Sequence, residues 1–193
     1  TKNQISINSK LIETWENSNR PLPPPHIIKV RTVNEFKKLT GYNVLVETGT
    51  FMGDMILSQL NNFDKIYSIE LSESYWKDAK LMFKAHAKVN LLLGDSGKVL
   101  QDLITKLKEP AVFWLDGHYS GGETAKGDKI CPIYEELNAI FKSNLSQCIL
   151  IDDARLFNGT DDYPKLEELK SFILENRPNA KINVNADTIS VLY

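Results

Sequence analysis

Residues 43–55 read NVLVETGTFMGDM, and the fold of the whole chain can be worked outward from this stretch. The apolar run from Val44 to Val46 predicts a buried strand, which ends on the acid Glu47. Two glycines follow, and the run after them, from Met55 to Leu60, predicts a helix. A strand, an acid, a glycine turn and a helix in this order are typical of the first unit of a nucleotide-binding sheet.

The two glycines of this stretch have different expected roles. Gly49 permits a sharp turn and lets a ligand lie against the backbone, because it has no side chain. Gly53 lets the helix pack close to the strand. The pattern is not the G-x-G-x-x-G dinucleotide fingerprint, since an acid, Glu47, precedes the first glycine. An acid in this place suits a ligand that carries an ammonium group, and the helix N-terminus suits its carboxylate.

On these residues the stretch resembles motif one of the class I S-adenosylmethionine (SAM)-dependent methyltransferases. The resemblance implies that Glu47 lies near the methionine amino group of SAM. It also implies that the turn lies against the ligand through Thr48, Gly49, Thr50 and Gly53. The alternative is an ordinary turn between a strand and a helix, with no ligand.

Composition excludes several classes of protein. The chain has 193 residues, a formal net charge of −2 and an isoelectric point near 5.9, so it shows no basic footprint for nucleic acid. Cys131 and Cys148 have the spacing of neither a zinc site nor a disulfide framework. Apolar runs are only as long as strands, and no signal peptide is visible. We therefore expect a cytoplasmic protein with no membrane or nucleic-acid partner.

The chain divides into two expected parts. Residues 1–40 would form a helix over Ile5–Asn17, a proline-rich tether over residues 20–26 and a short helix over Thr32–Leu39. Residues 41–193 would form the SAM-binding domain. The tether is interpreted as a plain linker.

A second interpretation of the N-terminal part is that it covers the mouth of the active site on the substrate side. In that case His26, Lys29 or Arg31 would meet the substrate.

Apolar runs and helical patterns alternate through the rest of the chain. Expected strands are residues 66–70, 89–93, 111–115, 148–151, 180–184 and 188–193; expected helices are residues 54–62, 72–88, 97–107, 133–142 and 164–175. The order predicts an α/β fold with a mostly parallel sheet. The resemblance implies the Rossmann-like methyltransferase form, with seven strands, an antiparallel last strand and helices on both faces.

Acids follow the strands one after another: Glu47, Glu70, Asp95, Asp116, Asp152 and Asp153. Ligands of such sheets bind at the carboxyl ends of the strands, so this recurrence predicts a binding site there. Glu70, with Leu71 beside it, is placed to accept both ribose hydroxyls. The resemblance puts Asp95 at the adenine amino group, with Ser96 nearby; either residue is also a candidate helix cap.

Asp116, Asp152 and Asp153 should lie together, because their strands would be neighbours. Three carboxylates repel one another unless a cation binds them, and all-oxygen ligands suit Mg²⁺, Mn²⁺ or Ca²⁺. The arrangement resembles the metal-dependent O-methyltransferases that act on sugars and other small molecules. This resemblance implies that Mg²⁺ (or Mn²⁺) holds the acceptor hydroxyls. The alternative is that Asp152 or Asp153 caps the next turn and pairs with Arg155.

A base must take the proton of the acceptor hydroxyl, and His118 is the first candidate, with Asp116 the second. The alternative for His118 is a loop histidine bonded to the backbone. The glycine-rich segment from Asp116 to Gly122, continuing to Asp128, Pro132 and Glu136, is typical of a substrate loop that closes over a site.

We therefore expect a SAM-dependent O-methyltransferase that acts on a small polar acceptor, a sugar hydroxyl being favoured, and a homo-oligomer is possible. The N-terminal part, about 40 residues, is shorter than in the sugar enzymes, which leaves the acceptor and the assembly open. A metal-independent methyltransferase and a non-catalytic SAM-binding module remain alternatives. An NAD dehydrogenase lacks support because the third glycine of the dinucleotide fingerprint is missing. A nucleic-acid methyltransferase lacks support because the chain is acidic. A hydrolase lacks support because no Gly-x-Ser-x-Gly occurs.

Overall fold

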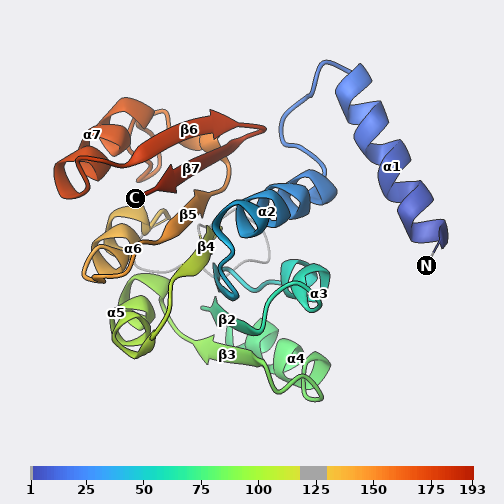
Figure 1. The fold of residues 1–193 in the computed structure, drawn as a ribbon, viewed down its shortest axis with the longest axis horizontal. Coiled ribbons are helices and arrows are strands. Elements are labelled where there is room, and N and C mark those ends of the chain that lie inside the picture. The colour runs from blue at the N-terminus through green and yellow to red at the C-terminus, as the bar shows by residue number, and fades with distance from the viewer. Residues whose placement is uncertain (1, 118–129) are drawn as a thin grey trace.

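The computed structural model describes residues 2–117 and 130–193, and residues 2–5 by their backbone alone. A seven-stranded sheet lies between two layers of helices (Figure 1). The strands are β1 (Val44–Thr48), β2 (Lys65–Glu70), β3 (Val89–Leu93), β4 (Ala111–Leu115), β5 (Cys148–Ile151), β6 (Lys181–Asn185) and β7 (Thr188–Leu192). The helices are α1 (Lys2–Asn17), α2 (His26–Thr40), α3 (Asp54–Gln59), α4 (Glu73–Met82), α5 (Ser96–Lys106), α6 (Ile133–Ile140), the short η1 (Ala154–Leu156) and α7 (Leu166–Asn176).

The sheet order is β3-β2-β1-β4-β5-β7-β6, and the strand order reverses between β1 and β4. Strands β1 to β5 pair in parallel, whereas β7 pairs antiparallel with both β5 and β6. The predicted α/β fold, its seven strands and its antiparallel last strand are therefore confirmed. The reversal between β1 and β4 places the open crevice of the sheet above these two strands.

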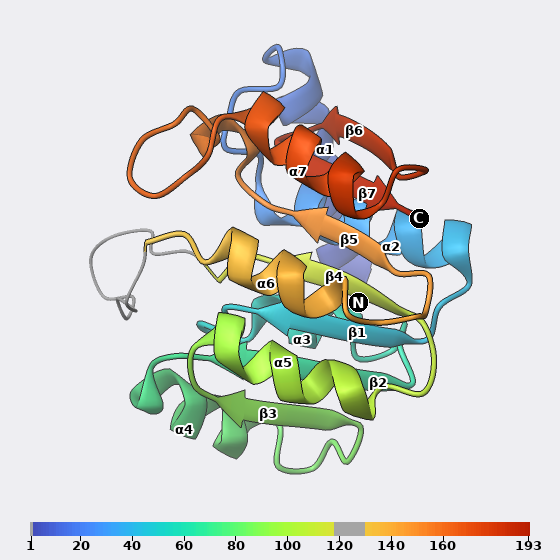
Figure 2. The same ribbon diagram turned by 90° about the vertical axis from the view of Figure 1, so that its left-hand side faces the viewer.

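Side chains alternate along each strand between two hydrophobic layers. Phe113 and Leu115 of β4 pack in the layer that contains α5, α6 and α7. Val112 and Trp114 pack on the other face, with α2, α3 and α4 (Figure 2). Both faces of the central strands are thus buried, which explains why these strands read as continuous apolar runs.

Helix α2 begins at His26, six residues before the predicted start at Thr32. Pro25 takes an extended conformation just before the helix, and the Thr32 hydroxyl donates to the carbonyl of Ile28 within it instead of capping an end. Ile28 and Val33 are buried, and Val33 packs against the sheet. The proline-rich segment therefore ends where this packing begins.

Helix α1 extends away from the sheet and contacts α2 (Figure 1). Its Trp15 is buried, and the indole N–H donates to the carbonyl of Pro21 at 2.8 Å. In the described part of the chain, no helix combines the length and the apolar character needed to cross a membrane.

Helix α4 ends at Met82, earlier than the predicted helix over residues 72–88. Phe83 follows it, and its ring lies against Gly53: a Cβ added there would lie 2.8 Å from the ring. Gly53 has a φ of +79° and precedes α3. We expected a glycine here because the helix packs closely on the strand. In the structure, the contact with Phe83 and the left-handed backbone explain why this position is a glycine.

Gly49 lies close to the backbone that follows β4. Its φ is +83°, and a Cβ there would lie 2.4 Å from the carbonyl oxygen of Asp116. Gly41, after α2, has a similar φ of +73° but no heavy atom within 4 Å of such a Cβ.

Substitutions at Gly41 and Gly49 separate the cost of a left-handed backbone from the cost of a steric clash. We expect Gly41→Ala to lower the free energy of unfolding by about 1 kcal/mol, the cost of the left-handed conformation. Gly49→Ala should cost clearly more, because the β1 turn and the end of β4 must also move apart. Urea unfolding of both variants measures the difference. Equal losses would show that the turn tolerates the extra methyl group.

Candidate active site

The parallel hydrogen-bond ladder continues past the ends of the central strands. The backbone N–H of Asp116 donates to the Thr48 carbonyl at 3.2 Å, and that of Asp152 donates to the Leu115 carbonyl at 3.0 Å. The Thr48 hydroxyl also accepts from the Asp116 N–H at 3.2 Å. These bonds bring Asp116 and Asp152 to one level at the carboxyl edge of the sheet.

Glu47 is only 2 % exposed and accepts a hydrogen bond of 2.5 Å from the Ser68 hydroxyl. The Thr50 hydroxyl shares a 2.6 Å hydrogen bond with Ser68, so three side chains form one buried chain of bonds. Burial, together with the charge of nearby Asp116, raises the pKa of Glu47 to about 8, against the opposing effect of the Ser68 hydrogen bond. A cationic ligand group beside Glu47 would favour its ionised form.

Glu70 is held by the backbone. Its carboxylate accepts from the N–H of Phe51 and from the N–H of Ser72, both at 2.8 Å. These bonds link the end of β2 to the turn after β1. Leu71, the next predicted contact, is exposed.

Asp95 and Ser96 lie where β3 leads into α5. Asp95 occupies the position before the helix, but its side chain makes no capping hydrogen bond, and the Lys98 ammonium is 4.0 Å away. The Ser96 hydroxyl donates to Glu136 of α6 at 2.6 Å. The capping hypothesis is therefore wrong for the Asp95 side chain. Glu136, which we assigned to a substrate loop, lies buried in α6.

A cavity of about 270 Å³ opens at this edge. One wall comes from the strand ends and the first turn: Glu47, Gly49, Thr50, Phe51, Met52, Asp54, Met55, Trp114 and Asp116. The opposite wall comes from the start of α2 and the segment before it: Pro23, Pro24, His26 and Lys29. The cavity thus lies between the predicted cofactor turn and the N-terminal part of the chain.

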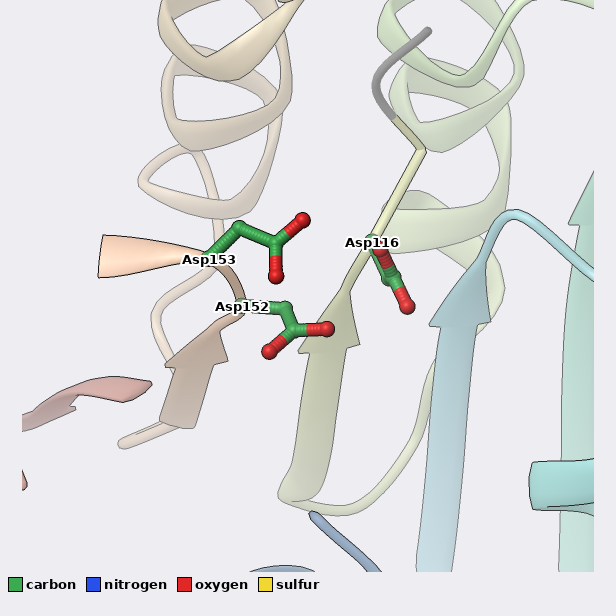
Figure 3. Close-up of side chains that lie close together, drawn as sticks. All are labelled: Asp116, Asp152 and Asp153. Carbon is green, nitrogen blue, oxygen red and sulfur yellow. The ribbon is translucent and has the colours of Figure 1, made fainter. Parts of the chain in front are cut away.

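Asp116, Asp152 and Asp153 converge beside the cavity (Figure 3). One oxygen from each carboxylate lies within 4.8 Å of the others. Asp152 is fully buried and Asp153 is 8 % exposed. Asp153 has a φ of +55°, and this left-handed turn directs the two consecutive side chains toward the same cluster.

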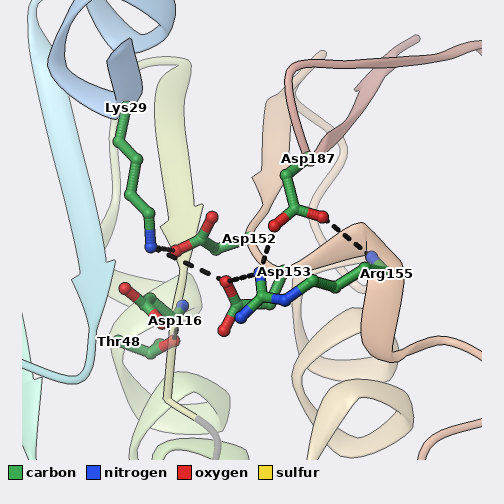
Figure 4. Close-up of polar contacts among 7 residues, drawn as sticks. All are labelled: Lys29, Thr48, Asp116, Asp152, Asp153, Arg155 and Asp187. Atoms are coloured by element: carbon green, nitrogen blue, oxygen red, sulfur yellow. Dashed lines mark hydrogen bonds and ion pairs between the residues drawn. The ribbon is translucent and has the colours of Figure 1, made fainter. Parts of the chain in front are cut away.

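Two cationic side chains contact these acids from opposite sides (Figure 4). The Lys29 ammonium binds Asp152 and lies 3.7 Å from Asp153. Arg155 donates to Asp153 at 2.7 Å and also binds Asp187, in the turn between β6 and β7. The predicted pair of Asp153 with Arg155 is present, although the Asp153 side chain does not cap η1.

The donor set fits a divalent cation. Among the described residues, the Oδ1 atom of buried Asp152 has no hydrogen-bond partner. Burial, and next the charge of Asp116, raise the pKa of Asp152 to about 8, against the opposing charge of Lys29. In the described network of Figure 4, four carboxylates face two cations, which leaves a formal charge of −2 when all groups are ionised.

The sequence named two histidines for this site, His118 and His26. His118, the first candidate for the base, lies outside the described residues. Within the described part of the chain, His26 is the histidine that lines the cavity. Burial lowers the pKa of His26, although Asp54 acts in the opposite direction. Its sequence signal is weak: a histidine three positions before a lysine, at the end of a proline-rich segment.

The comparisons with known proteins find similarity in structure alone. No protein-family model matches the sequence, and no curated protein matches it. An O-methyltransferase from Bacillus cereus in complex with S-adenosylhomocysteine (SAH) superimposes with a TM-score of 0.62 at 16 % identity, covering 97 % of this chain and 90 % of that one.

Two further solved structures show the same likeness. An SAH-bound methyltransferase from Podospora anserina gives a TM-score of 0.63 at 16 % identity, covering 94 % of this chain and 86 % of that one. An O-methyltransferase from Streptomyces achromogenes involved in tomaymycin synthesis, in complex with SAM, gives 0.62 at 16 % identity and covers 96 % and 87 % of the two chains. This chain has the Rossmann-like fold of the class I SAM-dependent methyltransferases.

Proposed function

We propose that the protein is a SAM-dependent O-methyltransferase that acts on a hydroxyl of a small polar acceptor, with a sugar as the favoured class, assisted by a divalent metal. One observation carries the proposal. Asp116 belongs both to the wall of the cavity and to the three-aspartate cluster, so the expected cofactor site and metal site share a residue.

The cofactor half of the proposal rests on the first turn. Glu47 would bind the ammonium group of SAM, while Thr48, Gly49, Thr50 and Gly53 shape the backbone against which the methionine lies. Glu70, fixed by two backbone N–H groups, would accept from the ribose hydroxyls. Leu71 would lie beside Glu70. Asp95 would accept from the adenine amino group, with Ser96 nearby. The solved structures with SAM and SAH support this assignment, because they share the fold.

Asp116, Asp152 and Asp153 would hold the metal, Mg²⁺ or Mn²⁺. When bound, such an ion acts as a Lewis acid and lowers the pKa of the hydroxyl to be methylated. The partnerless oxygen of Asp152 supports this use of the cluster. An acceptor with neighbouring hydroxyls, as in a sugar, suits an all-oxygen site of this kind.

The protein would position the reactants and remove one proton. The acceptor hydroxyl gives its proton to a base, for which His118 and Asp116 are the candidates. The oxygen then forms a bond to the methyl carbon as the carbon–sulfur bond breaks, and the electron pair stays on sulfur, which leaves SAH. Holding the oxygen in line with this bond accounts for much of the rate in such transfers.

A metal-independent methyltransferase is the second candidate, and the Lys29 contact favours it. The ammonium already brings a positive charge to Asp152 and Asp153. His118 or Asp116 would then act as base alone. The fold by itself also permits a SAM-binding module without catalysis.

Calorimetric titration with SAH, in Mg²⁺ and in a chelator, tests the proposal first. We expect binding in both conditions, with a separate heat for Mg²⁺ in the SAH-loaded protein. Absence of SAH binding would overturn the methyltransferase proposal. SAH binding without any Mg²⁺ heat would favour the metal-independent candidate.

Asp153→Asn should leave SAH affinity nearly unchanged and weaken Mg²⁺ binding. Methyl transfer from labelled SAM to a panel of sugars should fall by at least about 100-fold, because several kcal/mol of charge stabilisation is lost. Asp78→Asn, a change at an exposed aspartate of α4, is the control and should alter neither property. Loss of SAH binding in Asp153→Asn would contradict the division between cofactor and metal residues.

Glu47→Gln should change how stability depends on pH. The pKa of about 8 in the folded protein lies above the ordinary 4.5, so the folded state keeps a proton that the unfolded chain releases between these values. Wild-type stability should therefore fall, relative to the variant, as pH rises from 5 to 8, by at most about 1.4 kcal/mol per pH unit. Urea unfolding at several pH values measures this difference.

The same variant should bind SAH about tenfold more weakly at pH 8, because the ligand ammonium loses its carboxylate partner. Glu109→Gln, at an exposed glutamate, serves as the control for both measurements. A stability difference that stays constant with pH would show that Glu47 ionises normally in the folded protein.

A further inference from the structure

Lys29 connects the N-terminal helix α2 to the aspartate cluster, although 123 residues separate it from Asp152. Its side chain is 18 % exposed, and its ammonium contacts both Asp152 and Asp153 (Figure 4). The same side chain lines the cavity. Lys29 therefore belongs to the expected acceptor wall and touches two of the expected metal ligands.

The position of Lys29 is set by packing of α2. Val33 lies one turn further along the helix, is fully buried and packs against the sheet. Residues four positions apart share one face of a helix, so the packing of Val33 turns Lys29 toward the sheet edge. On the other side, His26 continues the same face to the cavity.

Stability is a weak explanation for this ion pair. Removing a carboxylate and an ammonium from water costs about as much as their attraction returns, and an apolar pair of similar size is often at least as stabilising. The pair also leaves the Oδ1 atom of Asp152 without a partner among the described residues. Lys29 therefore meets only part of the hydrogen-bonding and charge requirement of the aspartate cluster. This points to a role for Lys29 that is connected with binding of another cation.

We propose that Lys29 is a positioning residue that competes with a divalent cation for Asp152 and Asp153. Without the divalent ion, the ammonium holds both carboxylates close together in the positions of ligands. A divalent ion on the same oxygens repels the ammonium, since like charges at this distance oppose each other. The flexible stem of lysine then lets the ammonium move into the cavity that the side chain already lines.

This inference rests on the proposed function, because it deepens the account of the same site. Its consequence is a link between the metal and the acceptor. An ammonium in the cavity is a hydrogen-bond donor for an acceptor oxygen, so binding of the metal would prepare the acceptor wall of α2.

The test compares Lys29→Met, which removes the charge but keeps the length, with Lys29→Arg, which keeps the charge. Mg²⁺ is titrated calorimetrically into each SAH-loaded protein. We expect Lys29→Met to bind Mg²⁺ at least about tenfold more tightly than wild type, and Lys29→Arg to stay close to wild type. Lys170→Met, which breaks a 2.8 Å pair with exposed Glu167 on α7, is the matched control and should leave Mg²⁺ affinity unchanged.

Thermal unfolding distinguishes this role from that of a purely structural ion pair, because only a competitor of the metal makes the effect of the substitution depend on Mg²⁺. Lys29→Met should have a lower Tm than wild type in chelator and should recover it in Mg²⁺. An equal loss of Tm in chelator and in Mg²⁺ would overturn the proposal, and so would equal Mg²⁺ affinity in Lys29→Met and wild type. So would the absence of Mg²⁺ binding in both proteins.

Failure of this inference and of the proposed function can be told apart. If Lys29→Met binds Mg²⁺ and wild type does not, competition is supported but metal assistance in the natural protein is not. SAH binding, measured separately, reports on the methyltransferase proposal alone.

A measurement on the wild-type chain covers the case in which Lys29→Met does not fold. Amine labelling followed by mass spectrometry should show higher reactivity of Lys29 in Mg²⁺ than in chelator, relative to Lys170. Unchanged reactivity of Lys29 would overturn the displacement.

Discussion

The parallel register of β1, β4 and β5 is the constraint on which the rest of the site depends. The ladder bonds from Asp116 to Thr48 and from Asp152 to Leu115 place the ends of three strands at one level. A slip of one residue would turn every side chain of a strand to the opposite face. Because both faces are buried under helices, the hydrophobic layers hold the register, and the register holds the acids together.

Holding these acids at the sheet edge has an electrostatic cost that the molecule only partly offsets. The pKa of buried Glu47 and that of Asp152 are both raised to about 8, mainly by burial. Lys29 and Arg155 reduce the repulsion at the cluster without removing it. Buried acids with raised pKa values at the edge of a cavity are typical of sites that receive a charged ligand, and this is the basis of our proposal for an ammonium group and a divalent ion.

Particular residues show which features of the fold and the site could be predicted from the sequence. The strand-terminal acids were recognisable because each directly follows an apolar run, and their meeting follows from the geometry of parallel sheets. The start of α2 was misplaced because Thr32 looks like a cap, whereas burial of Ile28 and Val33 decides where the helix runs. Asp187 gave no signal at all, since its contact with Arg155 depends on how the last hairpin folds back.

The sequence by itself determined the alternation of strands and helices, the glycine turn after β1 and the row of acids at the carboxyl edge, because periodicity and local backbone chemistry set these features. Only the tertiary structure decided that the start of α2 lines the cavity and that Lys29 reaches Asp152. Those contacts join residues far apart in the chain, and they depend on the packing of whole elements. No local pattern encodes such packing, since it arises from the combined burial of many side chains.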